Sequence, residues 1–222
     1  MMYRALIASL ALSMLLPPTA AADAPPKRTA ARTHAVDDYA QQAKDAYGEG
    51  YAFIERATRL DHDAESARSG AERAAALKDS ARAYEDALDA FERAVRADAR
   101  MYEAYTYIGY ANRKLGRYEP SLFAYSTALK LKPDYARAIQ YQGEAFLGLN
   151  RFEDAKRNYL RLYALDGEQA QKLLGAMYRW LDEHARKHAP KVHSPLLTEA
   201  EAWLATQRRP SAHLAVNPQS PW

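Results

Sequence analysis

Three histidines near the end of the chain have the residue type and spacing to hold a metal ion. His184 and His188 stand four residues apart in a segment expected to be helical, so both would lie on one face, and His193 follows. No His-Glu-x-x-His pattern accompanies them, and no carboxylate is arranged as a base. The alternative is a basic helix end, where Arg186 and Lys187 favour the negative pole of the helix dipole.

Other residue patterns that support chemistry are incomplete. Asp61, Asp63 and Glu65 suggest a calcium loop, but the glycine and the closing glutamate that such a loop requires are missing. The segment Gly48–Gly50 is no phosphate loop, because no strand precedes it and the rest of the fingerprint is absent. There is no nucleophile elbow, and a chain without cysteine has no thiolate site or disulfide. We therefore expect no enzyme and no bound cofactor.

Residues 1–22 are expected to be an export signal. One charge, Arg4, precedes an apolar run from Ala5 to Leu16, and small residues from Thr19 to Ala22 provide a cleavage site. The run is shorter than the roughly 20 apolar residues that span a bilayer, so no stable membrane insertion is expected after cleavage. Without cysteine the protein is not a lipoprotein. The expected location is the periplasm or the medium outside a bacterial cell.

Charge is nearly balanced along the chain. There are 31 Lys and Arg against 28 Asp and Glu, a formal net charge of +3. Opposite charges are interleaved, as in Glu72-Arg73 and Glu92-Arg93, which is typical of solvated helix faces. A nucleic-acid binder would concentrate positive charge on one face, so no such partner is expected. Residues 23–35, rich in Pro, Ala and basic residues, are expected to form a flexible leader.

A segment in the middle of the chain repeats at a spacing of 34 residues. Aromatic side chains recur in two registers, namely Tyr84, Tyr118 and Phe152, and Phe91, Tyr125 and Tyr159. Gly109 matches Gly143, and a glycine there lets two helices approach closely because no side chain stands between them. This period is typical of helix pairs that stack, since one pair cannot bury its own apolar face. No segment alternates apolar and polar residues, so the protein is expected to be all-α.

Apolar periodicity and helix-breaking residues predict the individual helices. They are expected over residues 36–60, 101–115, 118–131, 135–149, 152–165 and 170–187, with a short helix over 196–206 in a Pro-containing tail, 188–222. Residues 71–98 form either one long helix or two helices divided at Asp79-Ser80. Gly116 and Asn150 mark turns, and Pro133 prevents the preceding helix from continuing.

The repeat resembles a known family. Residues 102–135 resemble a tetratricopeptide repeat through Tyr105, Ile108, Gly109, Gly116, Tyr118, Tyr125, Ala128 and Pro133. Residues 136–169 keep Gly143, Phe146, Phe152, Ala155 and Tyr159, and a degenerate copy over about 68–101 keeps Tyr84, Ala87, Phe91 and Ala94. The sequence of these two repeats also resembles that of small exported bacterial tetratricopeptide proteins. The resemblance implies a right-handed α-solenoid of two to three helix pairs within 36–187, with flanking helices and a C-terminal capping helix.

The resemblance also implies that the first helix of each pair lines a concave groove. It places there Glu103, Thr106, Tyr107, Tyr110, Arg113, Lys114, Arg137, Gln140, Tyr141, Glu144 and Leu147. Tyr107 and Tyr141 occupy equal positions, so their rings would lie side by side. Arg113, Lys114 and Arg137 would receive an acidic group. The alternative is that the tyrosines only stiffen the array and the charges are solvated.

One specific activity of the family is not expected. Chaperone-binding members clamp a C-terminal carboxylate with Lys, Asn and Arg side chains of the groove. The matching positions here are Glu72, Ala76, Tyr107, Arg137 and Tyr141, of which only Arg137 fits.

The expected function is that of a non-catalytic scaffold of the bacterial cell envelope. It would bind a protein or peptide partner in the tyrosine-lined groove. Two alternatives stay open. One is a metal-handling protein or enzyme that uses the C-terminal histidines. The other is a self-associating structural protein in which Trp203 and the tail dock into the groove of another copy.

Overall fold

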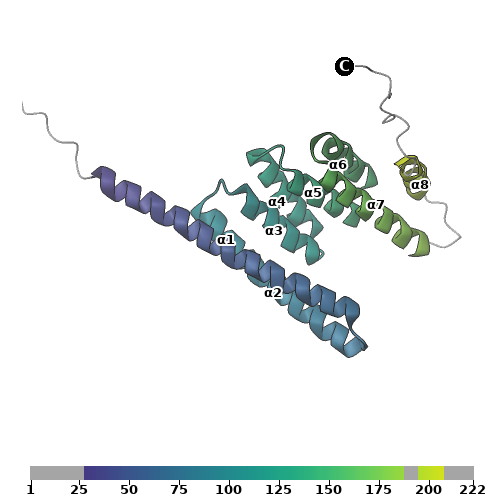
Figure 1. The fold of residues 1–222 in the computed structure, drawn as a ribbon, viewed down its shortest axis with the longest axis horizontal. Helices are drawn as coiled ribbons and strands as arrows, with labels where there is room; N and C mark the ends of the chain where they lie inside the picture. Colours follow the sequence, from purple (N-terminus) through teal and green to yellow (C-terminus); the bar gives the residue numbers. More distant parts are fainter. Residues whose placement is uncertain (1–27, 188–194, 208–222) are drawn as a thin grey trace, which may run out of the picture. The chain divides into compact units, whose positions relative to one another are not determined.

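The computed structural model describes residues 28–187 and 195–207, and no strand occurs among them. The helices are α1 (Arg28–Ser66), α2 (Gly70–Ala97), α3 (Tyr102–Lys114), α4 (Tyr118–Leu131), α5 (Ala136–Gly148), α6 (Phe152–Leu165), α7 (Gly167–Lys187) and α8 (Pro195–Gln207) (Figure 1). Residues up to Val36 form a unit of their own, of which only the first turns of α1 are described, and residues from Asp37 onward form the second unit. The expected all-α class is confirmed.

Helix α1 begins at Arg28, well before the expected start at residue 36, and continues to Ser66. Residues 28–35, expected to belong to a flexible leader, are therefore helical. Alanine and arginine, which dominate the segment 28–32, are strong helix formers, and no proline follows Pro26 until Pro120. The predicted export signal and the rest of the predicted leader lie outside the described residues.

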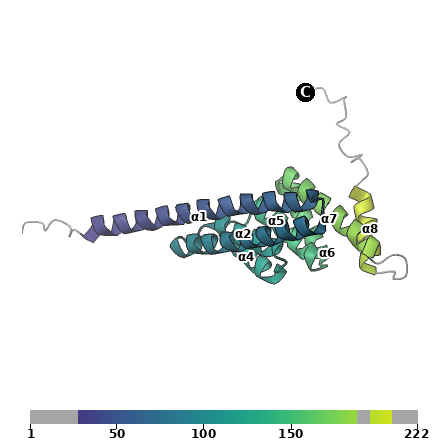
Figure 2. The same cartoon turned by 90° about the horizontal axis from the view of Figure 1, so that it is seen from below.

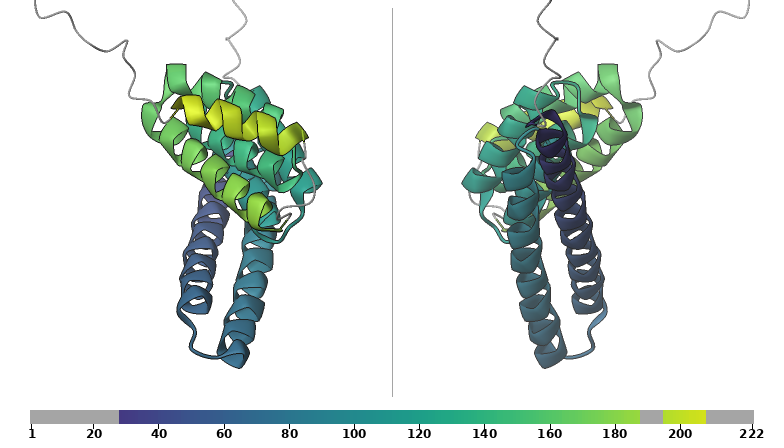
Figure 3. Two further views of the ribbon diagram at one scale, coloured as in Figure 1. Left: turned by 90° about the vertical axis from the view of Figure 1, so that its right-hand side faces the viewer. Right: turned by 90° about the vertical axis from the view of Figure 1, so that its left-hand side faces the viewer.

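Helix α2 is one continuous helix, Gly70–Ala97, rather than two. It begins with a capping box, in which the Ser69 hydroxyl accepts a hydrogen bond from the Glu72 amide and the Glu72 carboxylate accepts one from the Ser69 amide, both at 3.1 Å. Ser80, the alternative starting residue, is buried and donates its hydroxyl hydrogen to Asp61 of α1 instead. From Asp37 onward, α1 thus lies beside α2, and the two form a long hairpin (Figures 2 and 3).

This hairpin supplies the first helix pair of the stack. A Cβ atom on Gly50 of α1 would lie 2.8 Å from the ring of Phe91 on α2, and one on Gly109 of α3 would lie 2.5 Å from the ring of Tyr125 on α4. Phe91 and Tyr125 occupy the same register of the repeat, so α1 meets α2 as α3 meets α4. The prediction of a degenerate repeat over 68–101 is wrong for the first helix of that repeat. The first helix of the pair is α1, and residues 70–81 only lengthen α2.

The two clear repeats form the pairs α3–α4 and α5–α6, with helix bounds within one residue of those expected. Each pair turns on a residue with a left-handed backbone, Gly116 at φ 75° and Asn150 at φ 58°. Tyr125 and Phe152, which recur in the sequence pattern, are almost fully buried between the helices. The stacking that the repeat predicts is therefore what builds the core.

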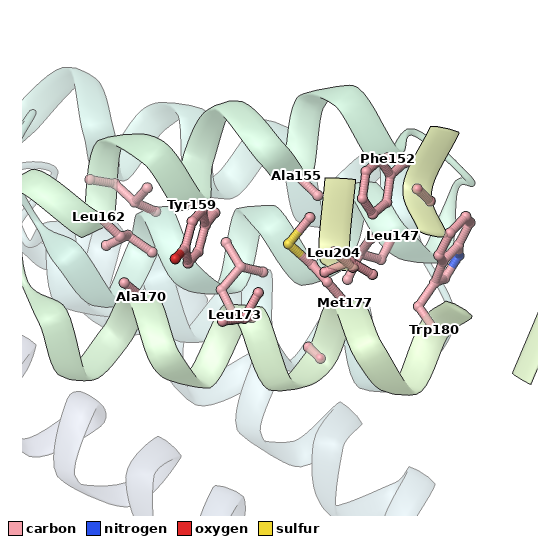
Figure 4. Packing of buried hydrophobic residues seen from close by; sticks show 14 residues of the cluster. Leu147, Phe152, Ala155, Tyr159, Leu162, Ala170, Leu173, Met177, Trp180 and Leu204 are labelled. Carbon is pink, nitrogen blue, oxygen red and sulfur yellow. The ribbon is translucent and has the colours of Figure 1, made fainter. Parts of the chain in front are cut away.

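Helices α7 and α8 cover the C-terminal end of the stack. Figure 4 shows Tyr159 and Leu162 of α6 and Leu173 of α7 lying between α6 and α7. Leu204 of α8 is 1% exposed in the same cluster, and the ring of Trp203 meets that of Tyr159 edge-on, with centroids 5.3 Å apart. Helix α8 contains the short helix expected over 196–206, whereas residues 188–194 and 208–222 of the predicted tail lie outside the described residues.

Candidate functional site

Helices α1, α3, α5 and α7 line a groove made of two adjoining hollows. The first hollow, of about 920 Å³, lies between α1, α3 and α5, where Tyr51, Ile54 and Arg59 of α1 form one wall. The second, of about 510 Å³, lies between α3, α5 and α7. Tyr110 and Tyr141 line both hollows, so the two lie next to each other. The groove thus runs along the first helix of each pair and onto α7.

Tyr107 lines the first hollow but belongs mainly to the core. It is 4% exposed, and its ring stacks on that of Phe91 with centroids 5.3 Å apart and planes 12° apart. The rings of Tyr47 and Tyr51 meet it edge-on at 6.0 and 5.5 Å. Its hydroxyl accepts a hydrogen bond from Nη1 of Arg137 at 2.8 Å. Burial raises the pKa of Tyr107 to about 12 despite the opposing effect of Arg137, so the hydroxyl stays protonated at neutral pH.

Tyr110 and Tyr141 meet at the junction of the two hollows, with ring centroids 5.0 Å apart. Tyr110 also lies 6.3 Å from Tyr107, so it stands between the two rings that the sequence places side by side. The guanidinium carbon of Arg113 lies 5.2 Å from the centroid of Tyr110 and 5.6 Å from that of Tyr141, within cation–π range. Arg113 also forms an ion pair of 2.8 Å with Glu144. Its charge is therefore already compensated.

Lys114 is tied to α1 through Asp61. The Lys114 ammonium lies 2.6 Å from the Asp61 carboxylate, which also accepts hydrogen bonds from Tyr84 at 2.8 Å and from Ser80. Burial alone would raise the pKa of Asp61, but the hydrogen bonds from Lys114, Ser80 and Tyr84 outweigh it and hold that pKa below its ordinary 3.8. One carboxylate thus joins α1, α2 and α3.

Three further residues predicted for the groove are buried. Thr106 is fully buried and donates its hydroxyl hydrogen to the Tyr102 carbonyl at 2.9 Å. Gln140, 3% exposed, donates to the Glu144 carboxylate, and Leu147 lies in the hydrophobic cluster beneath α7. The predicted residues that line the two hollows are Tyr107, Tyr110, Arg113, Lys114, Gln140, Tyr141 and Glu144. Glu103, Thr106, Arg137 and Leu147 line neither of them.

The sequence pattern assigned no groove residue to α1, although Tyr51 and Arg59 line the first hollow. The omission follows from the fixed 34-residue period, which places the first helix of that pair within 68–81. One local signal was present, because Gly50-Tyr51 repeats the step Gly109-Tyr110. Glycine allows close packing on the second helix of the pair, and the tyrosine beside it lines the groove.

The structure gives the histidine cluster no support in the residues that it describes. The Nδ1 atom of His184 lies 2.9 Å from the Trp180 carbonyl oxygen, and the two rings are 4.4 Å apart. His188 and His193 lie outside the described residues. No group of three or more metal-ligating side chains gathers anywhere in the described part of the chain. Trp203, the residue suggested for docking into another copy, packs on its own chain.

Comparison with known proteins does not assign a family. No family model matches the chain, and no curated protein matches it in sequence. Among solved structures, the crystal structure of MamA protein is similar, with a TM-score of 0.33 and 18% identity over 76% of this chain and 92% of that chain. A likeness at this level does not identify a function. Within the described residues, every helix is too short or too polar to span a bilayer.

Proposed function

We propose that this protein is a non-catalytic scaffold that holds an extended segment of a protein partner in the groove between α1, α3, α5 and α7. The observation that supports the proposal is that two neighbouring hollows extend across four helices, with the rings of Tyr110 and Tyr141 lining both. Tyrosine offers a rigid apolar surface with a hydrogen-bonding tip, and protein interfaces are enriched in it. Two neighbouring hollows along four helices suit an extended chain better than a compact small molecule.

The paired charges at the second hollow also favour a binding role over a catalytic one. Asp61 is held by three donors, Glu144 is paired with Arg113, and Lys114 is paired with Asp61. A general acid or base must be free to exchange a proton with the substrate, within hydrogen-bonding distance of it. These groups instead hold the helices of the groove together. The tyrosine rings are therefore already ordered before a partner binds.

Site-specific photo-crosslinking tests this function. Benzoylphenylalanine replaces Tyr51, an edge residue of the first hollow that is 41% exposed, or Phe123, which is 75% exposed on α4. Both are aromatic-for-aromatic exchanges, so each variant should fold. After irradiation in envelope extract, we expect adducts from position 51 that map to one short segment of a partner, and none of these adducts from position 123. Adducts of the same partner from position 123 alone would place binding on the other face and contradict the proposal.

The proposal includes export, which is supported by the N-terminal sequence. Leu10→Arg interrupts the apolar run between Ala5 and Leu16. We expect the wild-type protein in the envelope fraction with a shortened N-terminus, and the variant as full-length precursor in the cytosol. Identical fractionation and identical N-termini of the two proteins would contradict export.

A further inference from the structure

The two hollows of the groove differ in their charge. The second hollow is lined by four cations and one carboxylate, namely Arg113, Lys114, Lys172, Arg179 and Glu144. Half of the residues that line the first hollow are tyrosines or aliphatic residues, and the charges of its α1 wall are of both signs. A ligand that extends along the groove therefore passes from an aromatic region to a positively charged region.

Two carboxylates near the second hollow are already paired. Glu144 pairs with Arg113 and accepts a hydrogen bond from Gln140, and Asp61 pairs with Lys114. Arg179 is different, because it is exposed and forms no ion pair with any described residue. Beside it on α7, Asp182 is paired with Arg186 instead.

Lys172 adds to this excess of positive charge. Its ammonium pairs with Glu168 one turn earlier on α7, at 2.7 Å, and both side chains are more than half exposed. Exposed pairs of this kind contribute little and are exchanged readily for another partner. The second hollow thus offers Arg179 directly, and Lys172 after a small rearrangement.

On this basis we propose that the partner segment is acidic, with an Asp or Glu side chain at Arg179 and Lys172 and an adjacent apolar or aromatic side chain on Tyr110 and Tyr141. This inference rests on the function proposed above and specifies the chemistry of the ligand. Guanidinium and carboxylate form charge-assisted, bidentate hydrogen bonds, and complementary charge fixes the direction in which a peptide lies.

A single-stranded nucleic acid also combines negative charge with stacking rings, but the groove fits it less well. Its lining contains three carboxylates, Glu55, Asp63 and Glu144, which would repel a continuous phosphate backbone. The whole chain carries a net charge of only +3, without the basic excess of such binders. A peptide, in which acidic residues are placed singly, avoids this repulsion.

A displayed library of random peptides selected on the full-length protein tests the proposal. We expect retained sequences to carry Asp or Glu next to Trp, Tyr, Phe, Leu or Pro, and a synthetic copy to bind less tightly as salt rises. Arg179→Glu should weaken that peptide by about tenfold or more, as for loss of one charge-assisted contact. Lys130→Glu is the matched control, since it makes the same change of net charge at an exposed position of α4, and it should leave affinity unchanged.

The other outcomes separate the two proposals. Retained peptides without acidic residues, or equal affinities of the Arg179→Glu and Lys130→Glu variants, would overturn the acidic partner and leave the groove function standing. If a Tyr110→Ala/Tyr141→Ala variant with wild-type helicity retains the selected peptides as well as the wild type does, both the acidic partner and the groove function are overturned. Oligothymidylate that displaces the peptide and binds more tightly than it does would overturn the peptide class.

Discussion

Alanine should raise stability at one glycine of α1 but bring no gain, or a loss, at another glycine two residues later. Gly48 is exposed, and a Cβ atom there would meet nothing within 4 Å. Gly50 is buried two residues later, and a Cβ atom there would lie 2.8–2.9 Å from three ring atoms of Phe91. The ring has little room to move, because Phe91 is fully buried between Tyr47 at 5.5 Å and Tyr107 at 5.3 Å.

The magnitude follows from two opposing contributions. Replacing glycine by alanine in a helix interior adds about 1 kcal/mol of stability at either position. At Gly50 the new methyl group also overpacks the core, which costs about 1–3 kcal/mol. Because the helix contribution is common to both variants, the Gly48→Ala and Gly50→Ala proteins should differ by about 1–3 kcal/mol. For a chain of this size that is a difference of roughly 2–12 °C in melting temperature.

Thermal and urea unfolding followed by far-ultraviolet circular dichroism measure this difference. Gly48→Ala should melt above the wild type, and Gly50→Ala should melt below Gly48→Ala. Amide hydrogen exchange in α1 then shows whether the loss is local to the hairpin. If Gly50→Ala proves as stable as Gly48→Ala, α1 does not pack on Phe91, and its assignment as the first helix of the stack is wrong.

Three further substitutions probe other contacts. Asp61→Asn should cost about 1–3 kcal/mol of stability at neutral pH. Because folding lowers the pKa of Asp61, the stability that its charge contributes is fully present above the ordinary pKa of 3.8 and is lost as the pH falls through the lower pKa of the folded state. A difference in stability between wild type and variant that is the same at pH 7 and at about pH 3 would contradict this prediction. Leu204→Ala should cost about 2–5 kcal/mol and speed amide exchange in α8 but not in α2; unchanged α8 exchange would show that α8 is not docked. Ser69→Ala should destabilise α2 by about 0.5–2 kcal/mol, measured by unfolding in urea. Ser66→Ala removes no N-cap and should not have this effect. Equal urea midpoints of the two variants would refute the role of Ser69 as the cap.

The stack between Tyr102 and Leu165 could be predicted because the sequence marks its turns. Gly116 and Asn150 stand one period apart and both adopt the left-handed backbone that ends the first helix of a pair. Pro133 prevents α4 from continuing. Each boundary is therefore written into single residues whose backbone preferences are strong, and the aromatic register fixes how successive pairs meet.

The first pair could not be predicted from the period. The contact between Gly50 and Phe91 has the same geometry as that between Gly109 and Tyr125, but many more residues separate its two members along the chain. The extra residues lengthen both helices of the hairpin, so the packing is kept while the spacing is lost. A fixed-period comparison cannot detect such an insertion, because it aligns positions and not contacts.

The groove was predicted as a face, but the availability of its residues was not. The resemblance to tetratricopeptide repeats placed Thr106, Gln140 and Tyr141 on one side. Of these three, only Tyr141 reaches the junction of the hollows with its ring, and the other two are buried. Burial depends on the neighbouring helices, and α1 was not known to be one of them. Pairing is equally invisible in the sequence, since Arg113 and Glu144 come from different helix pairs.

The position of Tyr107, stacked on Phe91 beneath the first hollow, restricts how the specificity of the proposed binding groove can change. A replacement of Tyr107, which forms the floor of the first hollow, weakens the fold before it alters recognition. The outward positions of α1, such as Arg56 and Arg59, carry no such penalty. Attempts to redirect the protein toward a new partner should therefore randomise the α1 wall first, and natural divergence in recognition should accumulate there while the floor stays aromatic.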